Sequence, residues 1–294
     1  MNKFLERLNS GEIFVADGST GANLQKMGLK PGQPPEDLVI DTPDMVLKLA
    51  SMFVEAGSDI ILTCTFGGSR IRMKDSKYQD RAPEINTRAA EIARKAASLR
   101  DGVLVAGSIG PVGALIKPYG PLEVEEVKAT FAEEAKALAE GGVDLLLIET
   151  MFALEEATAA FEGARSVTNL PIIVSFSYDR GTRTMMGVKP KDVIKKYSEL
   201  GAVMVGANCG TTLENMETIV KEYVATVPNV PLWVKPNAGV PHMDVETEQG
   251  VYDMTPQDMA TYARKYVELG AKVVGGCCGS TPEHVAAIAK AVKQ

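Results

Sequence analysis

The feature that most limits how this chain can fold is a repeated alternation of short apolar runs with longer segments of helical periodicity. Continuous apolar runs are typical of parallel strands that are buried on both faces. Several helical segments end in glycine just before the next run, as at Gly57, Gly141, Gly201 and Gly270, which suits a left-handed residue after a helix. The expected strands are Phe14–Gly18, Asp59–Thr65, Val103–Ile109, Leu145–Thr150, Ile172–Tyr178, Val203–Cys209, Leu232–Asn237 and Lys272–Cys278.

Eight similar strand–helix units fill the 294 residues without a break in composition. We therefore expect one domain, residues 1–294, with the α/β fold of a (β/α)8 TIM barrel. An open doubly wound sheet is the competing arrangement, but eight similar units favour a closed barrel. The proline-rich stretch Gly28–Asp41 is expected to be a loop after the first strand.

The charge balance and the hydropathy limit the class of partner. The formal net charge is −7 and the pI is about 5.1, which argues against nucleic acid because phosphate binding needs a basic face. No apolar stretch is long enough to span a membrane, and the N-terminal segment does not read as a signal peptide. We expect a cytoplasmic protein with no membrane partner, in which the four cysteines are not structural disulfides.

Polar side chains stand at the carboxyl ends of the expected strands, where TIM barrels carry their catalytic groups. Acidic, amide and thiol groups are therefore expected to converge on one rim of the barrel. These residues are Asp17 after strand one, Glu149 after strand four, Asn208 and Cys209 after strand six, Asn237 after strand seven, and Cys277 and Cys278 after strand eight.

Three cysteines, Cys209, Cys277 and Cys278, fall at two of these strand ends. Three thiolates supply three corners of a zinc tetrahedron and leave the fourth position open, as in catalytic zinc sites. Neighbouring residues of a strand point to opposite sides, so the strand must bend at this pair, and the glycines around it permit that. We favour a metal site; buried core thiols and a vicinal redox pair are the alternatives.

Other candidate residues have simpler interpretations. Cys64 is expected to be a small buried core residue. His284 is expected on the surface of the last helix, and His242 in a loop near the rim, where it is either a substrate contact or an ordinary loop residue. The turn from Asp17 to Gly21 is either an anion-binding backbone turn or only a tight turn after a strand.

Taken together, these motifs resemble the homocysteine S-methyltransferase family, and most closely the homocysteine-binding barrel of cobalamin-dependent methionine synthase. The resemblance runs over nearly the whole chain. The residues that carry it are Asp17-Gly18 with Gly21, Thr63-Cys-Thr-Phe-Gly67, Gly107-Ser-Ile-Gly-Pro111, Glu149-Thr150, Gly206-Ala-Asn-Cys209, Lys235-Pro-Asn-Ala-Gly239 and Gly275-Gly-Cys-Cys-Gly-Ser-Thr-Pro-Glu-His284.

The resemblance implies a Zn2+ ion on Cys209, Cys277 and Cys278, with the homocysteine thiolate as its fourth ligand. It further implies methyl transfer to that thiolate, giving methionine. Asn237 matches a residue expected near the metal, where it would fill the open position when substrate is absent. The remaining matches concern the substrate: Asp17 and Glu149 would hold its amino group, the turn with Gly18, Gly21 and Ala22 would receive its carboxylate, and Asn208 would orient the site.

Two departures from the methionine synthase pattern stand out. The related barrel usually reads Thr-Asn-Thr-Phe where this chain has Thr63-Cys-Thr-Phe66, which puts the contacts from strand two in doubt. The chain also stops after the first barrel, without folate, corrinoid or activation domains. The resemblance therefore implies a methylcorrinoid, such as methylcobalamin, carried by a separate partner protein.

Three alternatives stay open. The methyl donor could be betaine, S-methylmethionine or S-adenosylmethionine, the acceptor could be another thiol within a corrinoid methyltransferase complex, or the chain could be a non-catalytic zinc–thiolate protein. A docked corrinoid protein is expected to contact loops Cys64–Arg72, Pro111–Gly120 and Asn237–Gly250, which would ring the metal.

Overall fold

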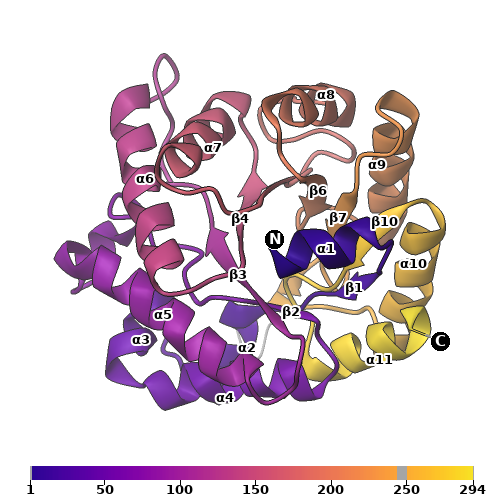
Figure 1. The fold of residues 1–294 in the computed structure, drawn as a ribbon, viewed down its shortest axis with the longest axis horizontal. Coiled ribbons are helices and arrows are strands. Elements are labelled where there is room, and N and C mark those ends of the chain that lie inside the picture. The colour runs from indigo at the N-terminus through magenta and orange to yellow at the C-terminus, as the bar shows by residue number, and fades with distance from the viewer. Residues whose placement is uncertain (1, 244–249, 294) are drawn as a thin grey trace.

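The computed structural model describes residues 2–243 and 250–293. Its centre is an 8-stranded parallel sheet in the order β1-β10-β7-β6-β5-β4-β3-β2, surrounded by helices (Figure 1). The strands are β1 (Phe14–Val15), β2 (Ile60–Leu62), β3 (Leu104–Ile109), β4 (Leu145–Met151), β5 (Ile172–Phe176), β6 (Met204–Asn208), β7 (Leu232–Lys235) and β10 (Ala271–Val274).

The first and last strands in that order meet and close the ring. Ala16 forms a parallel bridge with Ile60, and the Asp17 amide donates to the Ile60 carbonyl over 3.1 Å. On the other side, the Asp59 amide donates to the Val15 carbonyl over 2.7 Å. The fold is thus a (β/α)8 TIM barrel, as expected, and not an open sheet.

Helices surround the strands, and all but α1 come after a strand in the chain. They are α1 (Lys3–Asn9), α2 (Thr20–Met27), α3 (Leu38–Asp41), α4 (Pro43–Glu55), α5 (Ala82–Ala97), α6 (Val124–Glu140), α7 (Leu154–Val167), α8 (Pro190–Leu200), α9 (Leu213–Thr226), α10 (Pro256–Glu268) and α11 (Pro282–Val292). Short 3-10 helices η1 (Pro35–Asp37), η2 (Arg72–Asp75) and η3 (Gln79–Arg81) lie in the loops after β1 and β2, and a hairpin of β8 (His242–Met243) and β9 (Gly250–Val251) follows β7.

Helix α1 closes the amino-terminal end of the barrel. It lies across the ring of strands (Figure 1), and its Phe4 and Leu8 belong to the apolar cluster that fills the barrel interior with Phe14 and Trp233. A second, larger cluster fills the space between the strands and the outer helices. The amino-terminal part of the barrel interior is therefore filled with apolar side chains.

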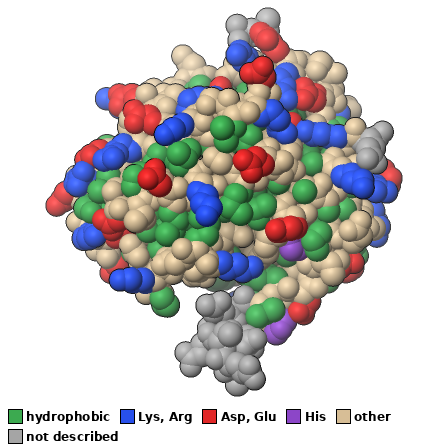
Figure 2. All heavy atoms as spheres, turned by 90° about the horizontal axis from the view of Figure 1, so that it is seen from below, with side chains coloured by type: hydrophobic (Ala, Val, Ile, Leu, Met, Phe, Trp, Pro, Cys, Tyr) green, Lys and Arg blue, Asp and Glu red, His purple; other side chains and the backbone are tan. Residues whose placement is uncertain are grey.

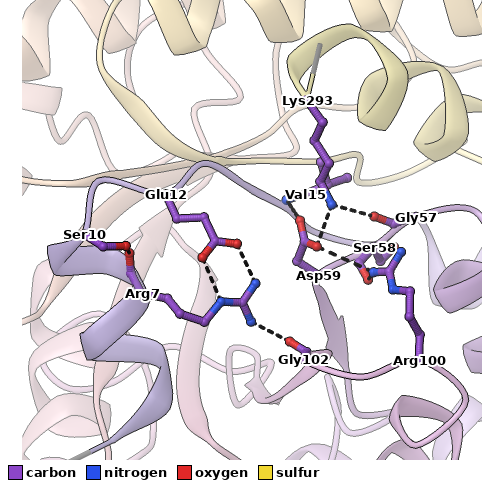
Figure 3. A network of polar contacts seen from close by, with 10 residues as sticks. All are labelled: Arg7, Ser10, Glu12, Val15, Gly57, Ser58, Asp59, Arg100, Gly102 and Lys293. Carbon is purple, nitrogen blue, oxygen red and sulfur yellow. Dashed lines mark hydrogen bonds and ion pairs between the residues drawn. The ribbon is translucent and has the colours of Figure 1, made fainter.

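A network of polar contacts fastens the closing seam at the amino-terminal end (Figure 3). The Asp59 carboxylate accepts hydrogen bonds from the Val15 amide over 2.9 Å and from Lys293 Nζ over 2.5 Å. Arg100 Nη2 lies 3.5 Å from the same carboxylate and donates to the Ser58 carbonyl. These contacts join the first two strands to the end of the last helix.

The structure corrects several details of the expectation. Gly28–Asp41 was expected to be a loop but contains η1 and α3, because Pro35 at the start of a helical turn and the apolar run after it favour helix. Gly141 has an ordinary helical φ of −73°, and the left-handed residue is its neighbour Gly142, with φ 86°. Most strands are also shorter than expected: β10 ends at Val274, before the cysteine pair.

The outer surface seen from below mixes charges of both signs with apolar side chains (Figure 2). Within residues 2–243 and 250–293, no helix combines the length and the apolar character needed to cross a membrane.

Candidate metal centre and substrate site

The three predicted cysteines lie together at the carboxyl ends of β6 and β10. Their sulfur atoms are all within 4.8 Å of one another, and Cys209 Sγ is 3.6 Å from Cys278 Sγ. Each cysteine is half-buried. The structure therefore brings the three thiols into one centre.

The backbone around the cluster explains how two successive cysteines reach one centre. β10 ends at Val274, and hydrogen bonds hold the segment after it against the residues that follow β7. The Cys277 amide donates to the Pro236 carbonyl over 2.7 Å, and the Cys278 backbone carbonyl accepts from the Ala238 amide over 2.9 Å. Cys209 itself has a left-handed φ of 60°, which turns its side chain out of the line of β6. The expected bend is thus present.

The donor set fits a zinc ion. A tetrahedral site with Zn–S bonds near 2.3 Å places its sulfur atoms about 3.8 Å apart, and the observed Cys209–Cys278 separation is 3.6 Å. The thiols compete for ionisation: hydrogen bonding to Cys277 raises the pKa of Cys209, whereas hydrogen bonding from Cys209 lowers the pKa of Cys278. A divalent cation relieves this competition.

Asn208, the residue before Cys209, is fully buried and has its amide fixed by four contacts. Its Oδ1 atom accepts from Ser175 Oγ over 2.6 Å and from the Thr150 amide over 3.1 Å. Its Nδ2 atom donates to Thr150 Oγ1 over 2.7 Å and to Cys277 Sγ over 3.9 Å. Thr150 has a left-handed φ of 61°, which brings both of its polar groups to the same amide.

Asn237 lies beside the cysteine cluster. Its Oδ1 atom accepts a hydrogen bond from the Cys278 amide over 3.0 Å, and its side chain is buried. Asn237 therefore joins the end of β7 to the segment that carries the cysteine pair.

Asp17, expected to hold a substrate amino group, is paired with a protein lysine. Lys235 Nζ lies 2.7 Å from Asp17 Oδ1, and the two side chains are only 3% and 4% exposed. Asp17 Oδ2 accepts from the Leu62 amide over 2.7 Å. Burial lowers the pKa of Lys235, but the charges of Asp17 and Glu149 outweigh it, and the net shift is upward.

Glu149 is buried at the end of β4 and accepts from Ser108 Oγ over 2.6 Å. Burial raises the pKa of its carboxyl group to about 7, although the Lys235 charge opposes that shift. Asp17 and Cys277 are close enough to act on the same carboxyl group electrostatically. Glu149, Asp17 and Cys277 thus all lie close enough to the Lys235 ammonium group to act on its charge.

The turn after β1 opens helix α2. Gly18 is tightly enclosed, since a Cβ atom there would lie 2.7 Å from the Phe53 ring and 2.9 Å from the Ser280 carbonyl. Gly21 faces open space, and Gly21 and Ala22 lie in the first turn of α2, where backbone amides point outward. The Ala22 amide is partnered by the Ser19 hydroxyl over 3.3 Å.

The remaining candidates lie outside the cysteine cluster. Cys64 is buried, donates to the Pro35 carbonyl over 3.6 Å and lines a cavity of about 20 Å³ shared with Asp17. His242 is exposed and lies 3.3 Å from Asp253. His284 is half-buried and not on the open surface: its Nε2 lies 2.9 Å from the Met254 carbonyl, while Nδ1 accepts from the Thr281 amide.

Four residues with contacts at the site were given no role from the sequence. Lys235 and Ser108 occur there only as members of longer motifs, and Ser175 and Tyr252 occur in none of the motifs. Lys235 ends an otherwise apolar strand, and a charged residue there could have signalled a buried pair. The two serines are in buried strands and show no sequence pattern of their own. The Tyr252 ring packs on Gly279, the residue after Cys278, from the segment between β9 and α10, a contact that depends wholly on tertiary structure.

Comparison with known proteins identifies relatives of the whole barrel. A family model described as homocysteine S-methyltransferase matches residues 14–292. The methionine synthase of Mycobacterium leprae (strain TN) is 28% identical over 296 residues, which cover 95% of this chain. The chain spans only about a quarter (24%) of that protein's length.

Solved structures show the same fold. The metallated form of the Escherichia coli homocysteine methyltransferase MmuM aligns with a TM-score of 0.83 and 22% identity, covering 98% of this chain and 99% of that one. A methyltransferase from Methanosarcina mazei aligns with a TM-score of 0.61 and 14% identity, covering 95% and 93%. Because the family model covers nearly the whole barrel, this chain belongs to the homocysteine S-methyltransferase family.

Proposed function

We propose that this chain binds one zinc ion through Cys209, Cys277 and Cys278 and transfers a methyl group to the thiol of homocysteine, giving methionine. The observation that carries the proposal is the cluster of three sulfur atoms within 4.8 Å at the mouth of the barrel. Zinc bound there would keep sulfur deprotonated at neutral pH, because a coordinated thiol loses its proton. The cytoplasm, where thiols stay reduced, suits such a centre.

The residues around the cluster would hold the amino-acid part of the substrate. Glu149 offers a buried carboxyl group for the ammonium, with Asp17 nearby but already paired with Lys235. The first turn of α2 at Gly21 and Ala22 would receive the carboxylate, since helix amino termini favour anions. Asn237 would approach the metal when substrate is absent, and Gly18 keeps the turn close to the barrel.

In the reaction, the substrate sulfur would attack the methyl carbon, a carbon–sulfur bond would form, and the donor's leaving group would depart with the electron pair. The role of this chain's side chains is to position that sulfur, and no proton need be removed at the moment of transfer. A protein base is therefore not part of the proposal.

For the donor we favour a methylcorrinoid on a separate protein over a small molecule. Support comes from the similarity to a methionine synthase, of which this chain matches one part. Large apolar side chains are exposed on the expected docking loops: Phe66 is 40% exposed, Tyr119 68% and Val240 56%. Residues 244–249 of the third loop lie outside the described residues.

A small methyl donor is the second candidate. The family model is named for the acceptor and not for the donor, so it leaves betaine and sulfonium compounds open. Cys64 in place of the usual asparagine likewise leaves room for another thiol acceptor, because it lines the same cavity as Asp17.

The test is to supply homocysteine with methylcobalamin, a methylcorrinoid protein, betaine, S-methylmethionine or S-adenosylmethionine, each separately, and to quantify methionine. The proposal expects turnover with the corrinoid donors. Turnover with betaine or a sulfonium compound alone would mean that the methyl donor is that small molecule and not a methylcorrinoid. If homocysteine does not raise the zinc coordination from three sulfur atoms to four, the acceptor is wrong.

A further inference from the structure

The backbone of Cys278 is held by the residues that follow β7. Its amide donates to Asn237 Oδ1 over 3.0 Å, and its carbonyl accepts from the Ala238 amide over 2.9 Å. The sheet itself does not fix this cysteine, because β10 already ends at Val274. The position of the Cys278 thiol therefore depends on where the residues after β7 lie.

Met254, in the segment before α10, holds those residues in turn. Its amide donates to the Ala238 carbonyl over 3.0 Å. Its side chain lies against Gly239, where an added Cβ atom would be 3.0 Å from Met254 Cγ. Gly239 also has a left-handed φ of 97°, so a larger residue there is disfavoured on both grounds. The two segments are thus in direct contact beside the cysteine cluster.

His284 joins Met254 to the first turn of α11. Its Nε2 atom lies 2.9 Å from the Met254 carbonyl oxygen, and its Nδ1 atom lies 3.2 Å from the Thr281 amide nitrogen. Because a carbonyl only accepts and an amide only donates, Nε2 carries the ring proton and Nδ1 carries none. Backbone groups on both sides therefore fix the orientation of the imidazole and its tautomer.

These contacts close a ring around Cys278. Hydrogen bonds lead from Cys278 to Ala238, from Ala238 to Met254, and from Met254 to His284. The chain itself then leads back from the first turn of α11 to Cys278. The first two links join backbone groups, whereas the third uses the His284 side chain. A substitution at His284 can therefore open this ring and leave its other links in place.

We propose that His284 is a positioning residue of the metal centre, which closes this ring and so keeps the Cys278 sulfur at the zinc ion. Groups that lie behind metal ligands orient them, and removing such a group typically lowers metal affinity 10- to 100-fold. The proposal rests on the proposed zinc centre. It goes beyond that centre by giving a role to a side chain outside the cysteine cluster.

Two substitutions separate the ring from the capping of α11. His284→Asn places an amide oxygen where Nδ1 lies, so it can still accept from the Thr281 amide, but it is too short to reach Met254. His284→Gln places an amide nitrogen where Nε2 lies, so it can still donate to the Met254 carbonyl, but it gives up the contact with Thr281. The first variant opens the ring and keeps the cap, and the second does the reverse.

The test is to measure the zinc affinity of each variant by competition with a chromophoric chelator, after circular dichroism has checked the fold. Absorption spectra are then recorded with cobalt(II) in place of zinc, because thiolate-to-cobalt charge transfer reports how many thiolates bind the metal. Urea unfolding gives the stability of each protein. His242→Asn is the matched control, because the other histidine lies 3.3 Å from Asp253, next to Met254 but outside the ring.

His284→Asn should lower the zinc affinity about 10- to 100-fold and weaken the charge-transfer band, since Cys278 is no longer held at the metal. His284→Gln should keep the affinity and the band near those of wild type. Its midpoint of urea unfolding should fall instead, because a contact that caps α11 is lost. His242→Asn should leave the zinc affinity unchanged.

Failure of this proposal differs from failure of the zinc centre. Wild-type protein that takes up no zinc would overturn the centre, and this proposal with it. If wild type binds zinc and His284→Asn binds it equally tightly, the centre stands and the role of His284 is wrong. An equal loss of affinity in His284→Asn and His284→Gln, or in His242→Asn, would also overturn it, since a general loosening would then explain the effect. A His284→Asn variant that does not fold would overturn it as well, because the bond to Met254 would then support the whole fold.

Discussion

Lys235 and Asp17 form an ion pair of 2.7 Å inside the barrel, although 218 residues separate them in the chain. Both side chains are almost completely enclosed, and Glu149 lies close enough to share the lysine's charge. One buried cation thus faces two acidic groups beside the cysteine cluster. The pair sets the charge of this part of the barrel before any ligand binds.

Replacing Lys235 by methionine should destabilise the fold by about 3–5 kcal/mol, because it leaves the Asp17 carboxylate buried without its partner. Unfolding in urea measures this loss. The double variant Asp17→Asn with Lys235→Met should recover part of the stability, since neither charge then remains unpaired. The control is Lys221→Met, which breaks a pair on the surface with Glu217 and should change stability by no more than about 1 kcal/mol.

Removal of any one cysteine of the cluster should abolish stoichiometric zinc. Purified Cys209→Ala, Cys277→Ala and Cys278→Ala would each be analysed for metal and compared with wild type. Cys64→Ala is the matched control, because that thiol is buried against the Pro35 carbonyl and should not affect zinc. A Cys278→Ala variant that still carries one zinc per chain would contradict the three-thiolate centre.

The eight strands could be predicted from the sequence because buried parallel strands leave continuous apolar runs. Their ends were less predictable. The apolar and small residues of Lys272–Cys278 read as one strand, yet β10 ends at Val274. After Val274 the backbone amides bond to residues outside the sheet: the Gly276 amide donates to the Asp17 backbone carbonyl, and the Cys277 amide donates to the Pro236 carbonyl. Such contacts come from distant loops and leave no local pattern.

The cysteine cluster could be predicted for the same reason that the fold could, since the ends of parallel strands meet at one rim. The side chains that lie against the predicted residues could not be predicted. Nothing near Asp17 in the sequence indicates Lys235, and nothing near Cys278 indicates Tyr252. The left-handed conformation of Thr150, which brings it to Asn208, is equally invisible in a strand of apolar residues.

Glu149→Gln should weaken homocysteine binding and leave zinc in place. A charge-assisted hydrogen bond contributes roughly 1.5–3 kcal/mol, so the dissociation constant should rise about 10- to 150-fold. Calorimetric titration of the zinc-loaded variant gives the affinity. Glu156→Gln is the matched control: its carboxyl group is also buried but accepts from the Val112 amide, and burial raises its pKa to about 7 as well. Equal losses in the two variants would mean that Glu149 has no special contact with the substrate.

The last prediction concerns the dependence of stability on pH. Burial raises the pKa of Glu156 from 4.5 in the unfolded chain to about 7 in the folded protein. Between these values the folded protein holds a proton that the unfolded chain has released. The stability that Glu156 contributes is therefore fully present below about pH 4.5 and is lost as the pH rises towards 7.

The size of this effect is on the order of 3 kcal/mol, from a shift of about 2.5 pKa units at 1.36 kcal/mol each. Glutamine carries no titrating proton, so Glu156→Gln should flatten the fall in the free energy of unfolding between pH 5 and pH 7.5. The measurement is urea unfolding at several pH values for wild type and variant. Burial also raises the pKa values of Glu36 and Glu134, so part of the slope should survive in the variant. An unchanged slope would mean that Glu156 ionises in the folded protein much as it does in the unfolded chain.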